Sequence, residues 1–472
     1  MFSSADDSLS LSKAAAAHAG LARGEIDAWA QALPERTSDL AADRAAYGAF
    51  WARSRALRAR LPAKAGRNAA EAAAVAAILA PERASRTRFL RAHVSAVYDA
   101  LTAQRTSFLR IDELCRRAAD AYPGLVPGAQ ELETEAHAAQ RDKDGVEIDH
   151  GLWVAQVLAD PAAGMHLCHA MLLPREGAHE RLTELERNGE IDLGAVHLKR
   201  HGKASMLTMR NPRFLNAEDA STLDAAEIAV DLALLDPMTE VCVLRGGTVE
   251  HPKHAGRRLF GAGINLTHLY HGRIPFLWYL ERDLGYVNKL YRGLALPDDA
   301  PPDEFGGQTI EKPWIAAVES FAIGGHCQIL LAVDYVLAEK NAFLTLPARK
   351  EGIIPGAANM RLPRAVGDRI ARQAIQYERR LECDSPEGRL ICDEIVETGG
   401  MDAAIERVVS GLTSSGVVSA ASNRRAFRIT QEPLEMFRQY FAVYAREQAY
   451  CHFSPALIAN LEKYWNAASR KP

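Results

Sequence analysis

The chain has 472 residues, a formal net charge of −4 and 48% hydrophobic residues, which allows two or three domains with a large core. The near balance of charge argues against nucleic acid or an anionic membrane surface as a partner. Seven scattered cysteines are typical of a reducing compartment, and neither a basic-then-apolar N-terminal signal nor an apolar run of about 18 residues is found. We therefore expect a soluble, cytoplasmic protein.

Residues 1–195 predict a separate helical domain, because they are rich in Ala, Arg, Leu and Glu and poor in β-branched runs. Three segments have amphipathic helical patterns, namely 69–79, 87–102 and 110–121. Proline interrupts the helical hydrogen-bond ladder, so four prolines are expected to separate the helices: Pro62, Pro81, Pro123 and Pro127.

A possible pair of metal ligands, His166 and His169, lies in the apolar stretch 153–173. No second pair follows at a spacing suited to zinc, and the chain contains no His-Glu-x-x-His motif. A buried helix whose histidines are hydrogen-bonded is therefore favoured, and we expect a protein without a metal.

Strands alternate with helices from about residue 203 onward. Apolar and β-branched runs predict strands at 203–209, 241–245, 315–319 and 334–338, and an Ala- and Leu-rich segment predicts a helix at 220–235. Asn216 is the expected N-cap of that helix, with Glu218 and Asp219 in its first turn, where carboxylates complement the helix dipole. Residues 376–472 return to helical patterns.

Two glycine-rich turns each follow a predicted strand. Gly324 and Gly325 precede an apolar helix at 327–333, and the earlier turn is Phe260-Gly-Ala-Gly-Ile-Asn-Leu266. Glycine lets a ligand approach the backbone closely, and the first N–H groups of a helix lack intrahelical partners. Two such turns suggest backbone donors that converge on one carbonyl oxygen, although tight turns that serve packing alone are the alternative.

These turns, with Asp334 and the segment Gly352-Ile-Ile-Pro-Gly-Ala357, resemble the enoyl-CoA hydratase/isomerase (crotonase) superfamily over residues 196–375. The resemblance implies an α/β fold, a crotonase-like spiral of ββα repeats, here with an additional N-terminal helical domain. It also implies C-terminal helices at 376–472 that serve oligomerisation, and hence a homo-oligomer, either a trimer or a dimer of trimers. The implied substrate is an acyl-CoA.

In that family, backbone N–H groups of the two turns bind the thioester oxygen. The resemblance assigns these donors to Ile264 and Gly325 and places the neighbouring Ala262, Gly263 and Asn265 against the substrate. The family's hydratases also carry two glutamates that activate water; here Gln328 and Ala348 stand at those positions, and Glu351 lies three residues too far along. An amide or a methyl group cannot act as a general base, so hydration is disfavoured.

Along its full length, the helical N-terminal region included, the chain resembles a dioxygenase branch of this family. That resemblance implies a reaction of (3,5-dihydroxyphenyl)acetyl-CoA with O₂ that yields 3,5-dihydroxyphenylglyoxylate and CoA, without a cofactor or a metal, for dihydroxyphenylglycine in glycopeptide antibiotics. The oxyanion-binding amides would stabilise an enolate whose electron-rich ring allows it to reduce O₂. Two alternatives remain: another aryl-CoA enzyme of this fold, such as a thioesterase, isomerase or decarboxylase, or an inactive acyl-CoA-binding protein.

Several side chains near these turns are candidates for contacts with the substrate. Gln328 would hydrogen-bond the substrate or a peroxide, Ala348 would leave room for O₂ or the ring, and Glu218 would position the substrate or steer the α-proton unless it only supports the helix start. The remaining candidates are His251 and Arg282 for the ring hydroxyls, and Arg213 and Arg258 for the CoA phosphates. Solvated Arg and His side chains are the commoner case.

Overall fold

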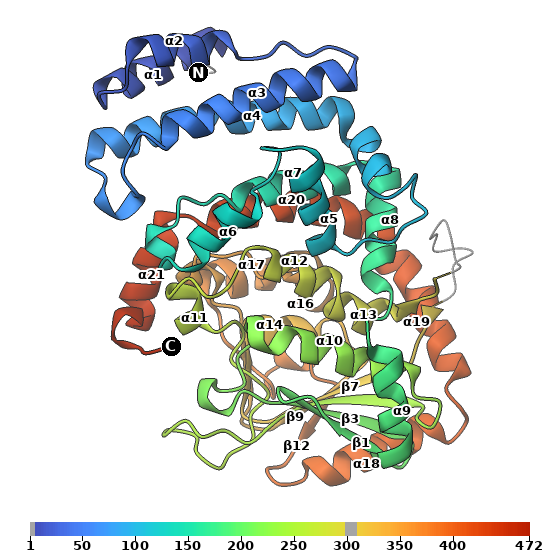
Figure 1. Cartoon of the computed structure of the whole chain (residues 1–472). Helices are drawn as coiled ribbons and strands as arrows, with labels where there is room; N and C mark the ends of the chain where they lie inside the picture. Colours follow the sequence, from blue (N-terminus) through green and yellow to red (C-terminus); the bar gives the residue numbers. More distant parts are fainter. Residues whose placement is uncertain (1–4, 298–308) are drawn as a thin grey trace. The chain divides into compact units, whose positions relative to one another are not determined.

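The computed structural model describes residues 5–297 and 309–472, which form two compact units (Figure 1). Unit 1 comprises Met1–Leu167 and Phe441–Phe453, and unit 2 comprises Cys168–Tyr440 and Ser454–Pro472. This division differs from the predicted boundaries at 195 and 375, because the segments on both sides of each boundary pack within unit 2. Within the described residues, no helix is both long and apolar enough to cross a membrane.

Unit 1 is helical, as its composition predicts. Its helices are α1 (Ala5–His18), α2 (Arg23–Gln31), α3 (Leu40–Arg58), α4 (Ala69–Leu101), α5 (Ile111–Ala121), α6 (Ala129–Ala136), α7 (Ile148–Ala159), the first part of α8 (Pro161–Leu172) and the last part of α20 (Leu434–His452), with 3₁₀ turns at Lys64–Gly66 and Gln140–Asp142. The predicted stretch 153–173 is helical as far as Leu172, apart from a break at Asp160. His166 is hydrogen-bonded through both ring nitrogens, to the Tyr98 hydroxyl (2.7 Å) and the Arg105 carbonyl (2.9 Å).

A single helix, α4, replaces the two helices predicted at 69–79 and 87–102. It begins at a capping box in which the Asn68 side chain accepts from the Glu71 N–H (3.0 Å) and the Glu71 carboxylate accepts from the Asn68 N–H (2.8 Å). The expectation that Pro81 separates two helices was wrong, since Pro81 lies inside α4. Proline removes one helical hydrogen bond, but buried side chains on both sides of it, such as Ile78 and Phe89, hold the helix to its neighbours.

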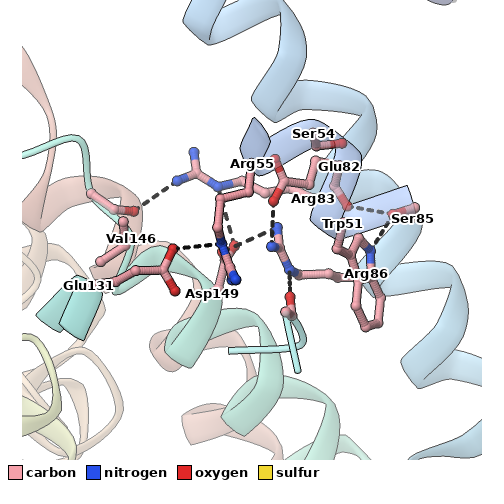
Figure 2. Close-up of polar contacts among 12 residues, drawn as sticks. Trp51, Ser54, Arg55, Glu82, Arg83, Ser85, Arg86, Glu131, Val146 and Asp149 are labelled. Carbon is pink, nitrogen blue, oxygen red and sulfur yellow. Dashed lines mark hydrogen bonds and ion pairs between the residues drawn. The ribbon is translucent and has the colours of Figure 1, made fainter. Parts of the chain in front are cut away.

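A buried network of ion pairs joins α4 to α7 within unit 1 (Figure 2). Arg86 lies between two carboxylates: its Nη2 is 2.5 Å from Glu82 Oε1 and its Nη1 is 3.1 Å from Asp149 Oδ2. Its Nε also donates to the Gly124 carbonyl (2.8 Å). Burial of a charge is unfavourable unless the charge is paired, so these partners make a buried guanidinium tolerable.

Unit 2 is built on a seven-stranded mixed sheet in the order β1-β2-β3-β4-β7-β9-β12. The pairs β1–β2 and β2–β3 are antiparallel and the other neighbours are parallel. Its strands are β1 (Glu190–Asp192), β2 (Val196–His201), β3 (Ala204–Met209), β4 (Val241–Gly246), β7 (Trp314–Val318), β9 (Tyr335–Glu339) and β12 (Glu394–Val396). Smaller sheets comprise β8 (Phe321–Ile323), β10 (Phe343–Thr345) and β11 (Leu381–Glu382), and β5 (Leu294–Ala295) with β6 (Thr309–Ile310).

Helices α10 (Ala220–Leu235) and α18 (Met401–Thr413) cover opposite faces of the large sheet (Figure 1). Val241 and Val243 of β4 pack against α18, whereas the Cys242 thiol between them lies 3.7 Å from the Ala233 carbonyl of α10. Successive strand residues point to opposite faces, so the central strands are buried on both sides, as their continuous apolar sequence predicts. Because α18 and β12 complete this layer, residues 376–413 belong to the core of unit 2.

Unit 2 contains further helices in addition to the last part of α8 and the first part of α20. They are α9 (Ala178–Asn188), α11 (Leu266–Tyr270), α12 (Leu277–Leu284), α13 (Tyr286–Arg292), α14 (Gly325–Leu330), α15 (Ala348–Glu351), α16 (Ala358–Val366), α17 (Asp368–Tyr377), α19 (Val418–Gln431) and α21 (Pro455–Trp465), with 3₁₀ turns at Pro212–Phe214, Gly388–Leu390 and Ala467–Ser469. The four predicted strands and the helix at 220–235 are confirmed to within one or two residues.

The N-cap of α10 is Asp219, which corrects the assignment to Asn216. Asp219 accepts from the Ser221 N–H (2.9 Å) and forms a capping box with Thr222. Asn216 has a left-handed φ of 57°, and its amide donates to the carbonyls of Gly247 (2.8 Å) and Leu259 (2.9 Å). Asn216 therefore holds neighbouring loops together instead of starting the helix.

We expect the substitution Arg86→Met to lower the free energy of unfolding by about 3 kcal/mol, because it removes the nearest counter-charge of two buried carboxylates. Glu82 and Asp149 would keep only their longer ion pairs, with Arg58 (3.3 Å) and Arg83 (3.4 Å) respectively. Arg116→Met provides the matched control, since Arg116 pairs with Glu113 on an exposed face of the same unit. Denaturant unfolding of both variants measures the difference. Equal stability of the two variants would show that the buried network contributes little.

Candidate active site

The two glycine-rich turns lie side by side in unit 2. Gly261 forms a parallel bridge with Ala322 of β8, and its carbonyl accepts from the Ile323 N–H at 3.0 Å. Gly263 has φ +75°, and a Cβ built on it would lie 3.0 Å from the Gly325 nitrogen. Only glycine allows the two turns to approach this closely.

The amides of Ile264 and Gly325 have no hydrogen-bond acceptor among the described residues. Gly325 is the first residue of α14, where N–H groups lack intrahelical partners. Ile264 forms a parallel bridge with Glu218. The two hydrogen bonds of that bridge involve the Gly263 carbonyl and the Asn265 N–H, so the Ile264 N–H takes no part in it. Two such amides in adjacent turns are suited to an oxygen that gains negative charge. Their assignment as donors to a thioester stays a prediction.

Glu218 contacts both turns, one through its backbone and the other through its side chain. Its N–H donates to the Gly263 carbonyl (2.7 Å), and its carbonyl accepts from the Asn265 N–H (2.8 Å). Its carboxylate approaches the other turn so closely that a Cβ on Gly325 would lie 2.7 Å from Oε2. Glu218 therefore fixes the spacing of the two candidate oxyanion donors.

Arg282 of α12 holds the Glu218 carboxylate in place. Its Nε lies 3.0 Å from both carboxylate oxygens, and its Nη2 donates to Glu218 Oε2 and to the Gly325 carbonyl, each at 2.8 Å. Its Nη1 donates to Asp283 (2.7 Å) and to Gln328 Oε1 (3.1 Å). These contacts occupy the five donors of the guanidinium. The structure thus directs Arg282 at protein acceptors, and its predicted contact with a ring hydroxyl stays a prediction.

The Glu218 carboxylate is a fixed negative charge. Burial, the largest single influence, would raise its pKa, but the charge of the Arg282 guanidinium and the hydrogen bonds from Arg282 and Tyr286 together hold the pKa below its usual range. The Tyr286 hydroxyl also donates to Oε1. Burial raises the pKa of Asp283 in spite of Arg282, so Glu218 is the carboxylate that the guanidinium keeps ionised. An ionised group of lowered pKa is a poor proton acceptor.

The ring of His326, the residue after Gly325, supports the first glycine-rich turn. Its Nδ1 accepts from the Gly263 N–H at 3.0 Å, and its ring lies edge-on to Phe260 with centroids 5.7 Å apart. Burial lowers the pKa of His326 to about 4, so the ring is neutral and Nδ1 is available as an acceptor. A Cβ on Gly261 would lie 2.2 Å from the ring, so that glycine makes room for it.

Three residues of this centre were not predicted, namely Asp283, Tyr286 and His326. A sequence signal existed only for His326, which stands inside the second glycine-rich motif. The other two follow Arg282 in the aromatic insertion 268–285 and at its end, where nothing in the residue pattern distinguishes them from ordinary packing.

The other predicted residues divide into neighbours of this centre and distant positions. Asn265 caps α11, accepting from the His268 N–H (3.1 Å) and donating to Asp219 (2.9 Å). The Ala262 N–H donates to the Leu215 carbonyl (3.1 Å), and Ala348 is a buried residue at the start of α15.

Three predicted ligands of the ring and the phosphates have no contact with the centre in the described residues. Arg213 lies 3.3 Å from the Pro472 carbonyl, and exposed Arg258 lies 3.3 Å from the Gly246 carbonyl. His251 is half-buried and accepts from the Lys253 N–H at 3.4 Å. In residues 5–297 and 309–472, no three His, Cys, Asp or Glu side chains are grouped so as to hold a metal ion.

Comparison with known proteins places this centre in a family. A sequence model described as enoyl-CoA hydratase/isomerase matches residues 307–428. The (3,5-dihydroxyphenyl)acetyl-CoA 1,2-dioxygenase of Amycolatopsis orientalis is 45% identical over 390 residues, which cover 82% of this chain and 88% of that protein. The carnitinyl-CoA dehydratase of Citrobacter koseri is 26% identical over 253 residues, covering 52% and 85% respectively. A solved enoyl-CoA hydratase from Mycobacterium avium subsp. paratuberculosis gives a TM-score of 0.48 at 20% identity, over 58% of this chain and 97% of that one.

The chain belongs to the enoyl-CoA hydratase/isomerase family, and within it to a group that includes the Amycolatopsis dioxygenase. The predicted family and the crotonase-like α/β fold class are confirmed. The 390 aligned residues exceed the length of unit 2, so the likeness to the dioxygenase also covers part of the helical unit 1.

The variant Gly325→Ala is expected to lose turnover by a factor of ~10²–10³, the usual effect of losing one oxyanion donor. The added Cβ would lie 2.7 Å from Glu218 and 3.0 Å from Arg282, so the turn would have to move. Gly411→Ala is the control, because Gly411 lies in α18 with no atom within 4 Å of its Cβ position. Steady-state kinetics would contradict the assignment if both variants turned over like the parent protein.

Proposed function

We propose that this protein is a dioxygenase that converts (3,5-dihydroxyphenyl)acetyl-CoA and O₂ to 3,5-dihydroxyphenylglyoxylate and free CoA. The observation that carries this proposal is the 45% identity to the Amycolatopsis dioxygenase along 82% of the chain. The alignment with carnitinyl-CoA dehydratase, in contrast, covers only 52% of the chain. The reaction would supply dihydroxyphenylglycine for glycopeptide antibiotics.

The side chains at the two hydratase positions support an activity other than hydration. Gln328 has an amide where a hydratase has a carboxylate, and the Arg282 guanidinium fixes that amide's oxygen. Ala348 offers only a methyl group. Neither residue can activate water, whereas the amides of Ile264 and Gly325 remain.

The proposed reaction begins with loss of an α-proton from the arylacetyl thioester. The electron pair of the broken C–H bond moves into the thioester, and the amides of Ile264 and Gly325 donate to the oxygen as it becomes negative. The enolate then gives electrons to O₂ at the α-carbon. Both oxygen atoms enter the arylglyoxylate, and the sulfur leaves as CoA, which balances the reaction without water.

We propose that no cofactor takes part, since the carbanion itself can serve as the reductant of O₂. The thioester and the electron-rich dihydroxyphenyl ring together acidify the α-carbon and stabilise the carbanion. The protein then supplies orientation and a preorganised field, which is the larger part of catalysis in such sites. We further propose a cytoplasmic homo-oligomer, a trimer or a dimer of trimers as in the family, without nucleic-acid or membrane partners.

The chelator-treated protein is expected to consume O₂ in step with the release of free CoA from (3,5-dihydroxyphenyl)acetyl-CoA. An oxygen electrode and a thiol reagent measure the two rates in parallel. Release of CoA without O₂ uptake would indicate a thioesterase-like enzyme instead. Binding of the thioester without either change would indicate an acyl-CoA-binding protein.

The variant Gln328→Glu is expected to lose at least about tenfold in turnover, because a third carboxylate would compete with Glu218 and Asp283 for one guanidinium. A change of one unit in the pKa of a carboxyl group at this site corresponds to ~1.4 kcal/mol, an energy equal to about a tenfold change in turnover. Gln373→Glu is the matched control, since Gln373 also accepts from an arginine, Arg379 (2.7 Å), but on an exposed face of α17. Unchanged O₂ uptake in Gln328→Glu would remove the proposed need for an uncharged side chain.

A further inference from the structure

Glu351 ends α15 beside the point where the two glycine-rich turns meet. Its side chain is buried, and its Oε1 and Oε2 lie 3.7 and 3.9 Å from the position of a Cβ built on Gly324. The Cα of Gly263, in the other turn, lies 3.7 Å from that same position. The Glu351 carboxyl group therefore lies beside the second glycine-rich turn, close to the place where that turn contacts the first.

Helical geometry explains how Glu351 reaches a position that sequence alignment assigns to Ala348. Residues 348–351 form the single helical turn α15, which ends at Gly352 with φ +77°. Residues three apart in a helix lie on the same side, so a side chain at 351 projects from the same side as one at 348. In an extended segment, a shift of three residues would have placed it on the opposite side.

The carboxylates of Glu218 and Glu351 border successive residues of the same turn but have opposite environments. Glu218 adjoins Gly325 and is held by Arg282, whereas the Glu351 carboxyl has no hydrogen bond or ion pair with any described residue. Burial raises the pKa of Glu351 to about 7, and the negative charge of Glu378 adds to this rise. Two carboxyl groups with divergent pKa values commonly divide the roles of fixed charge and proton transfer.

We propose that the Glu351 carboxylate is the base that removes the α-proton from the bound arylacetyl thioester. This role rests on the proposed function. In the step, a carboxylate oxygen forms a bond to the α-proton, the C–H bond breaks, and its electron pair moves into the thioester as the amides of Ile264 and Gly325 bind the oxygen. The proton on Glu351 later protonates the departing CoA sulfur or passes to solvent.

The groups around Glu351 set the pH at which it can accept a proton. On α15 itself, Arg349 and Lys350 form ion pairs with Glu378, at the end of α17, at 2.9 and 2.5 Å. The packed helix α21 carries titratable side chains at three successive positions, Glu462, Lys463 and Tyr464. Among these neighbours, the charge of Glu378 is the one that raises the pKa of Glu351.

Exchange of the α-hydrogens in deuterated buffer without O₂ measures the proposed step directly. The parent protein should exchange them at a rate that rises with pH through about 7, as Glu351 ionises. Glu351→Gln is nearly isosteric and should reduce the rate by ~10²-fold or more, the usual contribution of a general base. Exchange by Glu351→Gln at the parent rate would overturn the proposal.

Two further measurements keep the test decisive. Glu378→Gln should keep the maximal exchange rate and move the midpoint of its pH profile downward, because a negative charge near Glu351 is lost; an unmoved midpoint would overturn the proposal. The raised pKa of Glu351 stabilises the protein below its unfolded-state value of about 4.5 and ceases to do so as pH rises through about 7. Thermal unfolding of Glu351→Gln should therefore lack that loss, which verifies that the variant is folded and that the titrating group is Glu351.

The failure of this inference is distinguishable from the failure of the proposed function. If the parent protein consumes O₂ but Glu351→Gln still exchanges the α-hydrogens normally, another group is the base. If the parent protein exchanges the α-hydrogens through Glu351 without consuming O₂, the base is correct and the dioxygenase proposal is wrong.

Discussion

The candidate site depends on one buried ion pair, between Arg282 and Glu218. Two desolvated charges are tolerable only when their geometry is good and their remaining donors and acceptors are satisfied. Arg282 meets this condition with three contacts to Glu218 and with further bonds to Gly325, Asp283 and Gln328. The ion pair thereby links α12, the start of α14 and the loop before α10. The Glu218 backbone also holds the first glycine-rich turn. The Arg282–Glu218 ion pair therefore determines how the two glycine-rich turns lie relative to each other.

The features that sequence predicted well are those that depend on backbone chemistry. The central strands are buried on both faces, so their apolar runs are unambiguous, and glycine is required where Gly263 and the Gly324–Gly325 turn approach each other. In both cases the residue type alone, apolar or glycine, indicates the structural constraint at that position. The residue pattern was therefore sufficient to locate both turns, whereas the choice of Ile264 and Gly325 as the oxyanion candidates within them came from the family resemblance.

The features that sequence could not predict depend on tertiary contacts. Pro81 inside α4 and the capping of α10 by Asp219 instead of Asn216 are decided by packing and by loop geometry. Tyr286 matters only because its hydroxyl reaches Glu218, which is 68 residues away in the chain. The register of Glu351 differs by three residues from that of a hydratase glutamate, and only the helical conformation of α15 brings it beside Gly324.

The arrangement suggests how one scaffold serves different reactions. An oxyanion site made of backbone amides cannot move without disturbing the sheet and helix that support it. Its geometry is therefore fixed by the fold. A carboxylate on a short helix can change position by a turn without altering the backbone, since residues three apart share one side. Here a hydratase-like carboxylate is absent at 328 and 348, and a buried carboxyl group is present at 351. A single base with a pKa near 7 suits the removal of one acidic α-proton, whereas hydration needs two carboxyl groups acting on water.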